Sequence, residues 1–217
     1  MKGGQELLKS GSRAEFIRRF RGSAPAAQLN IFYRWTGRDL GDLHRLALGD
    51  PFSLKPPTPA ELLSDPSGIN RWHGKNLMPP WLPWLSRFEK VFFRHGAQFF
   101  GHNRTTYMRL AGPGYFQALT AGDAPEITRR YGIESPELHL LFDYTSIPPG
   151  EAQRKDLPPI RDNQSCPIRV FADLRDFVIF LDRDLLVGPA FGLRNPAKPI
   201  GFFALLRHNF PEAATRR

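Results

Sequence analysis

Short apolar and aromatic runs separated by turn residues dominate the middle of the chain. Residues 87–119 read RFEKVFFRHGAQFFGHNRTTYMRLAGPGYFQAL, with turns expected at 95–97 and 112–114. Aromatic and β-branched residues suit a pleated surface, and Gly/Pro clusters interrupt it. The pattern predicts antiparallel strands joined in sequence order. Apolar residues occur on both faces of these runs, so periodicity does not decide whether the phenylalanines fill a core or line a pocket.

Other segments carry the same kind of signal. Further strands are expected at 69–75, 138–147, 185–193 and 200–208. A turn is expected at 182–184, just before the two closing strands. The run 167–180 mixes helix and strand signals, and Pro167 after Ser165 favours the start of a helix.

The first 50 residues have helical periodicity instead. Ser12 followed by Glu15 fits a capping box, so a helix is expected to begin there and to end near Gly22. A second amphipathic run covers 23–35, and a short third turn is expected at 40–48.

Composition and charge narrow the class of protein. Hydrophobic residues make up 41% and charged residues 24% of the 217, which is enough apolar material to bury a core. The net charge is +9, but the basic residues never form a block of five or six, which argues against nucleic acid as a partner. Cys166 is the one cysteine, and no secretory signal or membrane-spanning apolar run is evident, so we expect a cytoplasmic protein.

The segment Trp72-His73-Gly74-Lys75 joins an aromatic ring, an imidazole and an ammonium group. On a strand, His73 and Lys75 would share one face and could point into a pocket. The commoner arrangement is a strand edge with exposed polar groups and a histidine that is already hydrogen-bonded. Asp143, and the pair Asp173 and Asp176, are candidates for acid–base work, although a carboxylate at the end of an element is usually just solvated.

No motif of high specificity for metal, nucleophile or phosphate is present. Histidines occur in or beside expected strands at 95, 102, 139 and 208, but neither H-E-x-x-H nor paired C-x-x-C spacing accompanies them. We therefore predict no metal and no cofactor. Haem stays open, because one strand histidine and an apolar cavity would hold it.

The segment 78–88, MPPWLPWLSRF, is the best candidate for a contact surface. Trp81 and Trp84 alternate with prolines and leucines, and basic residues follow. Such a segment could close the end of a barrel, act as a lid over a cavity, or meet an anionic membrane surface.

Residues 70–208 resemble a known group of proteins. Trp72-His73-Gly74-Lys75, the stretch 142–148 and the closing segments 182–188 and 201–207 are similar to uncharacterised bacterial proteins with a GxWxG domain and its partner domain. These in turn resemble lipocalin-like, or calycin-like, barrels. The Gly-Trp-Gly signature itself is absent, and 33–37 is a partial echo of it.

These observations predict an α+β fold: N-terminal helices packed on an antiparallel lipocalin-like β-barrel or strongly curved sheet. We expect a helical region at 1–50, a proline-rich linker at 51–68, the barrel domain at 69–210 and a disordered tail at 211–217.

A small antiparallel barrel encloses one small ligand, so binding of a lipid, isoprenoid or polyketide-like molecule by a carrier or sensor is the leading hypothesis. The expected ligand-binding residues are Trp72, His73, Trp81, Trp84, Phe93, Tyr107 and Phe142. One alternative is an enzyme that uses His73, Lys75 and Asp143 in the same cavity. A second alternative is a peripheral membrane protein.

Overall fold

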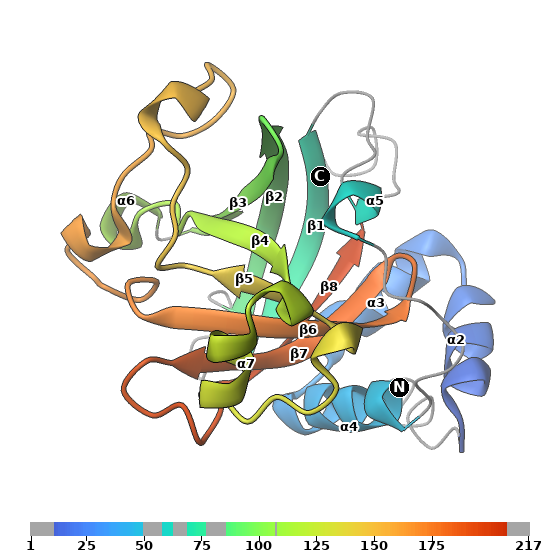
Figure 1. The fold of residues 1–217 in the computed structure, drawn as a ribbon. Coiled ribbons are helices and arrows are strands. Elements are labelled where there is room, and N and C mark those ends of the chain that lie inside the picture. The colour runs from blue at the N-terminus through green and yellow to red at the C-terminus, as the bar shows by residue number, and fades with distance from the viewer. Residues whose placement is uncertain (1–10, 50–57, 63–68, 77–85, 107, 208–217) are drawn as a thin grey trace.

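Eight antiparallel strands close into a β-barrel in the computed structural model, which describes residues 11–49, 58–62, 69–76, 86–106 and 108–207 (Figure 1). The strands follow one another around the barrel in sequence order, and β8 pairs with β1 to complete it. Their bounds are β1 Ile69–Asn76, β2 Arg87–His95, β3 Gln98–Arg104, β4 Phe116–Thr120, β5 His139–Asp143, β6 Leu174–Asp182, β7 Leu185–Gly192 and β8 Gly201–Arg207. The predicted fold class is confirmed.

Side chains alternate between the barrel interior and its outer surface. On β8, Phe203 and Leu205 belong to the interior cluster, whereas Ala204 and Leu206 belong to an outer cluster beneath the helices. Because both faces of this strand are buried, it reads as a continuous apolar run. The ambiguity in the sequence pattern therefore has a structural cause.

Helices α2 (Arg13–Arg21), α3 (Pro25–Arg34) and α4 (Gly37–Leu48) cover one side of the barrel (Figure 1). Ser12 caps α2 by accepting a hydrogen bond from the Glu15 amide, and Gly22 ends the helix, as predicted. α4 is longer than the expected turn, because Thr36 and Asp39 form a complete capping box. None of the helices in the described ranges has the length and apolar character that crossing a bilayer requires.

Two local predictions were wrong. Residues 112–114 do not form a hairpin turn, because α6 (Met108–Ala111) lies between β3 and β4. Pro167 does not start a helix: the chain runs through turns until β6 begins at Leu174, so tertiary packing overrides the local signal. The remaining connections hold α5 (Pro59–Leu62), α7 (Pro125–Arg130) and short 3-10 turns at 121–123, 136–138, 150–152 and 163–165.

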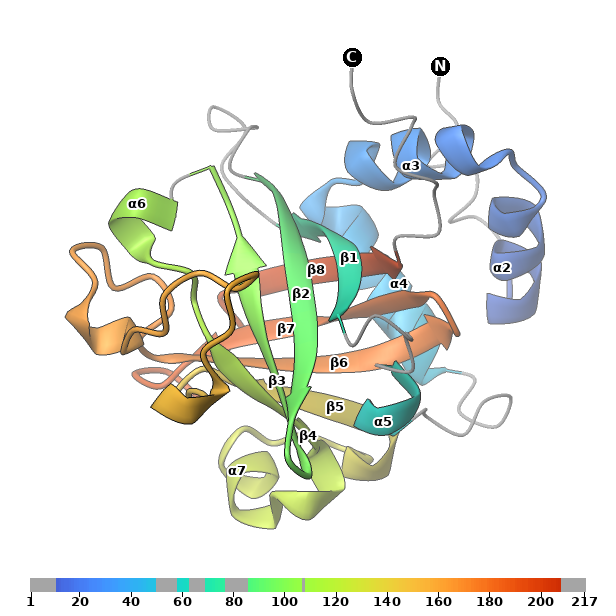
Figure 2. The same cartoon turned by 90° about the horizontal axis from the view of Figure 1, so that it is seen from above.

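The interior is divided between a packed half and an open half. Trp72, Phe92, Phe116, Phe142 and Phe180 fill one part with interlocking rings. The other part holds a cavity whose lining includes Leu110 of α6 and Ile200 of the β7–β8 connection. In both views α6 lies on the opposite side of the barrel from α2 and α3 (Figures 1 and 2). The barrel is therefore only partly filled by its own side chains.

Candidate functional site

The open half of the barrel holds a cavity of about 480 Å³, within the size range of small-molecule sites. Its lining comes from several barrel strands, from Thr105 and Leu110 after β3, and from the loop before β6. Its lining residues are Asn76, Phe88, Lys90, Asn103, Thr105, Leu110, Tyr144, Ile168, Val170, Phe171, Leu174, Asp176, Ala190, Ile200, Gly201, Phe202 and Phe203. Most of these side chains are apolar or aromatic, so the cavity suits a hydrophobic molecule.

Lys90 projects from the middle of β2 into the barrel and is almost completely buried. Its Nζ donates hydrogen bonds to Asn103 Oδ1 at 3.2 Å, to Asp176 Oδ2 at 3.1 Å and to the hydroxyl of Tyr144. The three donors of an ammonium group are thus all used. All four residues line the cavity, so a polar cluster lies inside an otherwise apolar space.

The partners of Lys90 are also bonded to one another. Asn103 Nδ2 donates to Tyr144 Oη at 2.9 Å, and Tyr144 Oη donates to Asp176 Oδ2 at 3.2 Å. The four side chains come from β2, β3, the end of β5 and β6, so only barrel closure brings them together. We call this set, Lys90, Asn103, Tyr144 and Asp176, the lysine cluster.

Aromatic rings surround the ammonium group. The distances from Nζ to the ring centroids are 4.4 Å for Phe116, 4.9 Å for Tyr144, 5.1 Å for Phe142, 5.4 Å for Phe203 and 5.7 Å for Phe88. A cation within about 6 Å of a ring face is attracted to its quadrupole, more strongly where water is excluded. The rings therefore offset part of the cost of burying this charge.

Burial works against ionisation of both charged partners. It lowers the pKa of Lys90 and raises the pKa of Asp176, while their mutual attraction opposes both shifts. A buried ion pair is often no more stable than well-packed apolar residues of similar volume. The burial of this ion pair is therefore weak evidence that the pair stabilises the barrel.

Two further residues of the cavity lining carry a buried polar atom. Asn76 Oδ1 and Thr105 Oγ1 are buried and have no hydrogen-bond partner within the described part of the chain. Buried polar atoms are usually hydrogen-bonded, because desolvation without compensation is costly. These atoms could accept or donate a bond to a bound molecule.

The candidate catalytic residues of the sequence prediction do not meet. The alternation on β1 puts Trp72 inside the barrel and turns His73 and Lys75 outward. His73 Nδ1 shares a hydrogen bond with Tyr33 Oη of α3 at 2.9 Å, and Lys75 donates to Ser86 at 2.6 Å. His73 and Lys75 lie on the outer face and do not line the cavity.

Asp143, the third candidate, is held elsewhere on the outer face. It pairs with Arg175 Nε at 3.2 Å and accepts bonds from the amide and hydroxyl of Thr145. Its carboxylate is satisfied by these neighbours and is absent from the cavity lining. The three candidates therefore share no site.

The expected ligand-binding aromatics occupy several environments. Trp72 and Phe142 are interior core residues, and the Phe142 ring contacts the lysine cluster without lining the cavity. Phe93 faces outward and packs with Phe100 beneath the loop around 152–157. Trp81, Trp84 and Tyr107 lie outside the described residues.

Sequence reasoning missed Lys90, Asn103 and Tyr144 as site residues, and it named Asp176 as an acid–base candidate only in a pair with Asp173. One signal was available. Lys90 lies two residues from Phe88 and from Phe92, so the period of a strand places the three on one face. A lysine within a row of aromatic residues can face either solvent or the barrel interior. Only the closed barrel shows which face of β2 is inside.

The described residues contain no group of three or more His, Cys, Asp or Glu side chains arranged to hold a metal ion. No imidazole from the described part of the chain lines the cavity. His44 is half-buried and His102 is buried, both away from the cavity, and desolvation lowers the pKa of each to about 4. Comparisons with protein-family models, with curated proteins and with solved structures give no match to the chain.

Proposed function

We propose that this protein binds a small hydrophobic molecule bearing one polar group, such as a lipid, isoprenoid or polyketide-like compound, as a carrier or sensor. The observation that carries the proposal is the lysine cluster within an apolar cavity of about 480 Å³. An apolar cavity with a few convergent polar groups is the usual form of a ligand site. The resemblance to calycin-like barrels points in the same direction.

The geometry suggests how the ligand would lie. The apolar body would contact Phe203, Leu174 and Ala190, and the polar group would reach toward the lysine cluster or toward Asn76 and Thr105. A hydroxyl, carbonyl or carboxyl group could make these bonds. Specificity would then come from the polar group, because a buried donor left unpaired is penalised more than a lost apolar contact.

Binding is tested by titrating a long-chain alkane, the alcohol of the same length and the fatty acid of the same length, with calorimetry and with displacement of a fluorescent hydrophobic probe. Native mass spectrometry of the protein as purified would reveal a retained ligand. We expect the alcohol or the acid to bind at least about tenfold more tightly than the alkane, equivalent to one or two hydrogen bonds. No binding of any of the three would overturn the proposal.

Two variants separate cavity binding from binding to the surface. Ala190→Phe places a ring in the cavity and should abolish binding, whereas the same change at the exposed Ala27 of α3 should not. Tyr144→Phe removes one hydroxyl of the lysine cluster and should reduce the preference for the polar ligand while sparing the alkane. Equal binding by Ala190→Phe and Ala27→Phe would mean that the probes do not enter the barrel.

An enzyme acting in the same cavity is the second candidate, and one observation favours it. The amine of Lys90 lies beside two groups that exchange protons, Asp176 and Tyr144. A neutral lysine amine can attack an aldehyde, forming a carbon–nitrogen bond while the carbonyl oxygen leaves as water. Treatment with a long-chain aldehyde and cyanoborohydride, followed by peptide mass spectrometry, tests this. Labelling of Lys90 would support catalysis, and labelling confined to surface lysines would exclude it.

A further inference from the structure

The mouth of the cavity is ringed by exposed aliphatic side chains. In the described part of the chain, the large hydrophobic residues that stand exposed are Leu110, Ile168, Val170 and Ile200, at 53%, 45%, 42% and 68%. All four line the same cavity. Scattered exposed apolar residues are ordinary, but their concentration around one opening marks a contact surface. We call these four residues the rim.

Backbone hydrogen bonds fix the positions of three of the rim residues. The Ile168 amide donates to Leu110 O at 3.2 Å, and the Val170 amide donates to Ile168 O at 2.9 Å. The Ile200 amide donates to Ala190 O at 2.8 Å, which ties it to strand β7. These hydrogen bonds hold the rim residues in place at the mouth of the cavity.

Basic side chains alternate with the rim. Arg109 and Arg169 directly adjoin rim residues in the sequence and are exposed, and Arg194 and Lys198 are exposed on the β7–β8 connection. Arg169, Arg194 and Lys198 line a second hollow of about 440 Å³ that shares Val170 and Ile200 with the cavity. Asp173 is the acidic residue of this hollow, and it accepts a hydrogen bond from Gln164. Positive charge thus predominates around the mouth.

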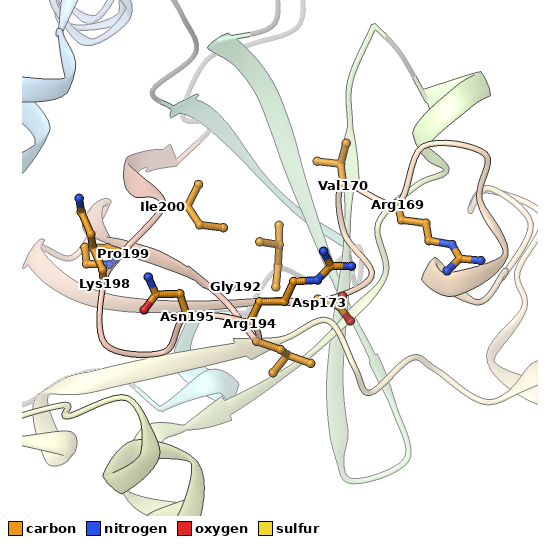
Figure 3. Close-up of a pocket in the computed structure, with 11 residues that line it drawn as sticks. Arg169, Val170, Asp173, Gly192, Arg194, Asn195, Lys198, Pro199 and Ile200 are labelled. Carbon is orange, nitrogen blue, oxygen red and sulfur yellow. The ribbon is translucent and has the colours of Figure 1, made fainter.

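The directions of these side chains distinguish two kinds of partner. Figure 3 shows Arg169 and Lys198 extending away from each other on opposite sides of the hollow, with Arg194 between them. A site for a single small anion needs donors that converge on one point. Diverging charges around an apolar rim instead match a broad anionic surface, into which aliphatic groups can insert.

We infer that the rim is a docking surface for an anionic lipid bilayer. The aliphatic residues would enter the interface between headgroups and acyl chains, and the basic residues would meet lipid phosphates. The cavity would then open toward the membrane, where hydrophobic molecules are concentrated. The rim residues are different residues from Trp81 and Trp84, which lie outside the described residues.

Vesicle co-sedimentation tests the inference with the full chain. We expect binding to phosphatidylcholine vesicles that contain about 30% phosphatidylglycerol, weak binding to pure phosphatidylcholine, and loss of binding between about 0.1 M and about 1 M salt. Absence of binding to the anionic vesicles at low salt would overturn the inference.

Matched variants locate the surface. Ile168→Ser/Ile200→Ser should weaken vesicle binding at least about tenfold. Arg169→Gln/Arg194→Gln should weaken it about twenty-fivefold, at roughly fivefold for each charge removed. Arg34→Gln/Arg38→Gln removes the same charge from exposed positions on the helical side and should have little effect. Since all these positions are exposed, circular dichroism should show folded variants. Rim variants that bind like wild type, or loss of binding only in Trp81→Ala/Trp84→Ala, would refute the rim as the docking surface.

Further measurements distinguish membrane docking from dimerisation and from ligand binding. If Ile168→Ser/Ile200→Ser converts a dimer to a monomer in sedimentation velocity and vesicles are not bound, the rim is an interface between two copies and the inference is wrong. Ala190→Phe should abolish ligand binding in solution while leaving vesicle binding intact. Failure of the proposed ligand-binding function is thereby distinguishable from failure of membrane docking.

Discussion

The ion pair between Lys90 and Asp176 makes a sharp prediction about stability. Both side chains are almost fully buried, and their charged atoms lie 3.1 Å apart. Lys90→Met leaves the buried carboxyl of Asp176 without its ammonium partner. Asp176→Leu leaves the buried ammonium group of Lys90 without its carboxylate partner. We expect each single substitution to lower the free energy of unfolding by about 3–5 kcal/mol, the usual cost of breaking a buried pair.

The double variant Lys90→Met/Asp176→Leu should recover most of this loss. Its two apolar side chains would lie among Phe88, Phe116 and Phe203 with no charge left to desolvate. Urea unfolding of the wild type, both single variants and the double variant at pH 7 gives the coupling free energy directly. Additive effects, with a coupling below about 0.5 kcal/mol, would show that the two groups are not a buried pair.

The pH dependence of Lys90→Met provides a second check. Without the ammonium group, burial keeps the pKa of Asp176 raised in the folded state, because desolvation disfavours the charged carboxylate. An unfolded aspartate ionises near pH 3.9, so the variant is most stable below that pH and loses stability as the pH rises toward the folded pKa. The slope can reach at most about 1.4 kcal/mol per pH unit, and it ends once the pH exceeds the folded-state pKa of Asp176. Adding Asp176→Asn should remove that slope, and a slope equal to that of wild type would refute this account.

Two further predictions concern the scaffold. Burial lowers the pKa of His102 to about 4, so the folded state holds it neutral and loses stability as the pH falls from about 6.5 toward 4. Between pH 7 and pH 5, the free energy of unfolding should fall by about 2 kcal/mol less in His102→Leu than in wild type, as measured by chemical denaturation. An equal fall in both proteins would contradict this. A Cβ at Gly188 would overlap the carbonyl oxygen of Phe177 on β6, so Gly188→Ala should cost at least about 2 kcal/mol. A Cβ at Gly122 would contact nothing, so Gly122→Ala should change the free energy of unfolding by less than about 0.5 kcal/mol. Equal changes for Gly188→Ala and Gly122→Ala would show that β6 and β7 can move apart to accept the extra methyl group.

Local sequence signals determined the elements whose boundaries depend on neighbouring residues. Ser12 and Gly22 delimit α2 because capping is a contact between residues a few positions apart. The strand expected at 69–75 is β1, and the turn at 182–184 joins β6 to β7. The aromatic and proline-rich composition likewise favoured strands and turns over long helices.

Signals that depend on distant partners were less reliable. Pro167 suits the first turn of a helix, yet that segment packs across the cavity mouth and continues into β6. The segment between β3 and β4 contains α6 where a tight turn was expected. In both places the chain follows contacts with the barrel that no local pattern encodes.

The candidate site itself was decided by tertiary structure. The strand period shows that Phe88, Lys90 and Phe92 share a face, and that His73 and Lys75 share another. It does not say which face is inside, because helices and loops cover apolar residues on the outer surface as well. Closing β8 against β1 turned the lysine face inward, and β3, the end of β5 and β6 then brought its three partners within hydrogen-bonding distance. Barrel closure depends on pairings between residues far apart in the chain. Those pairings place Lys90 in the cavity, which no local sequence pattern predicts.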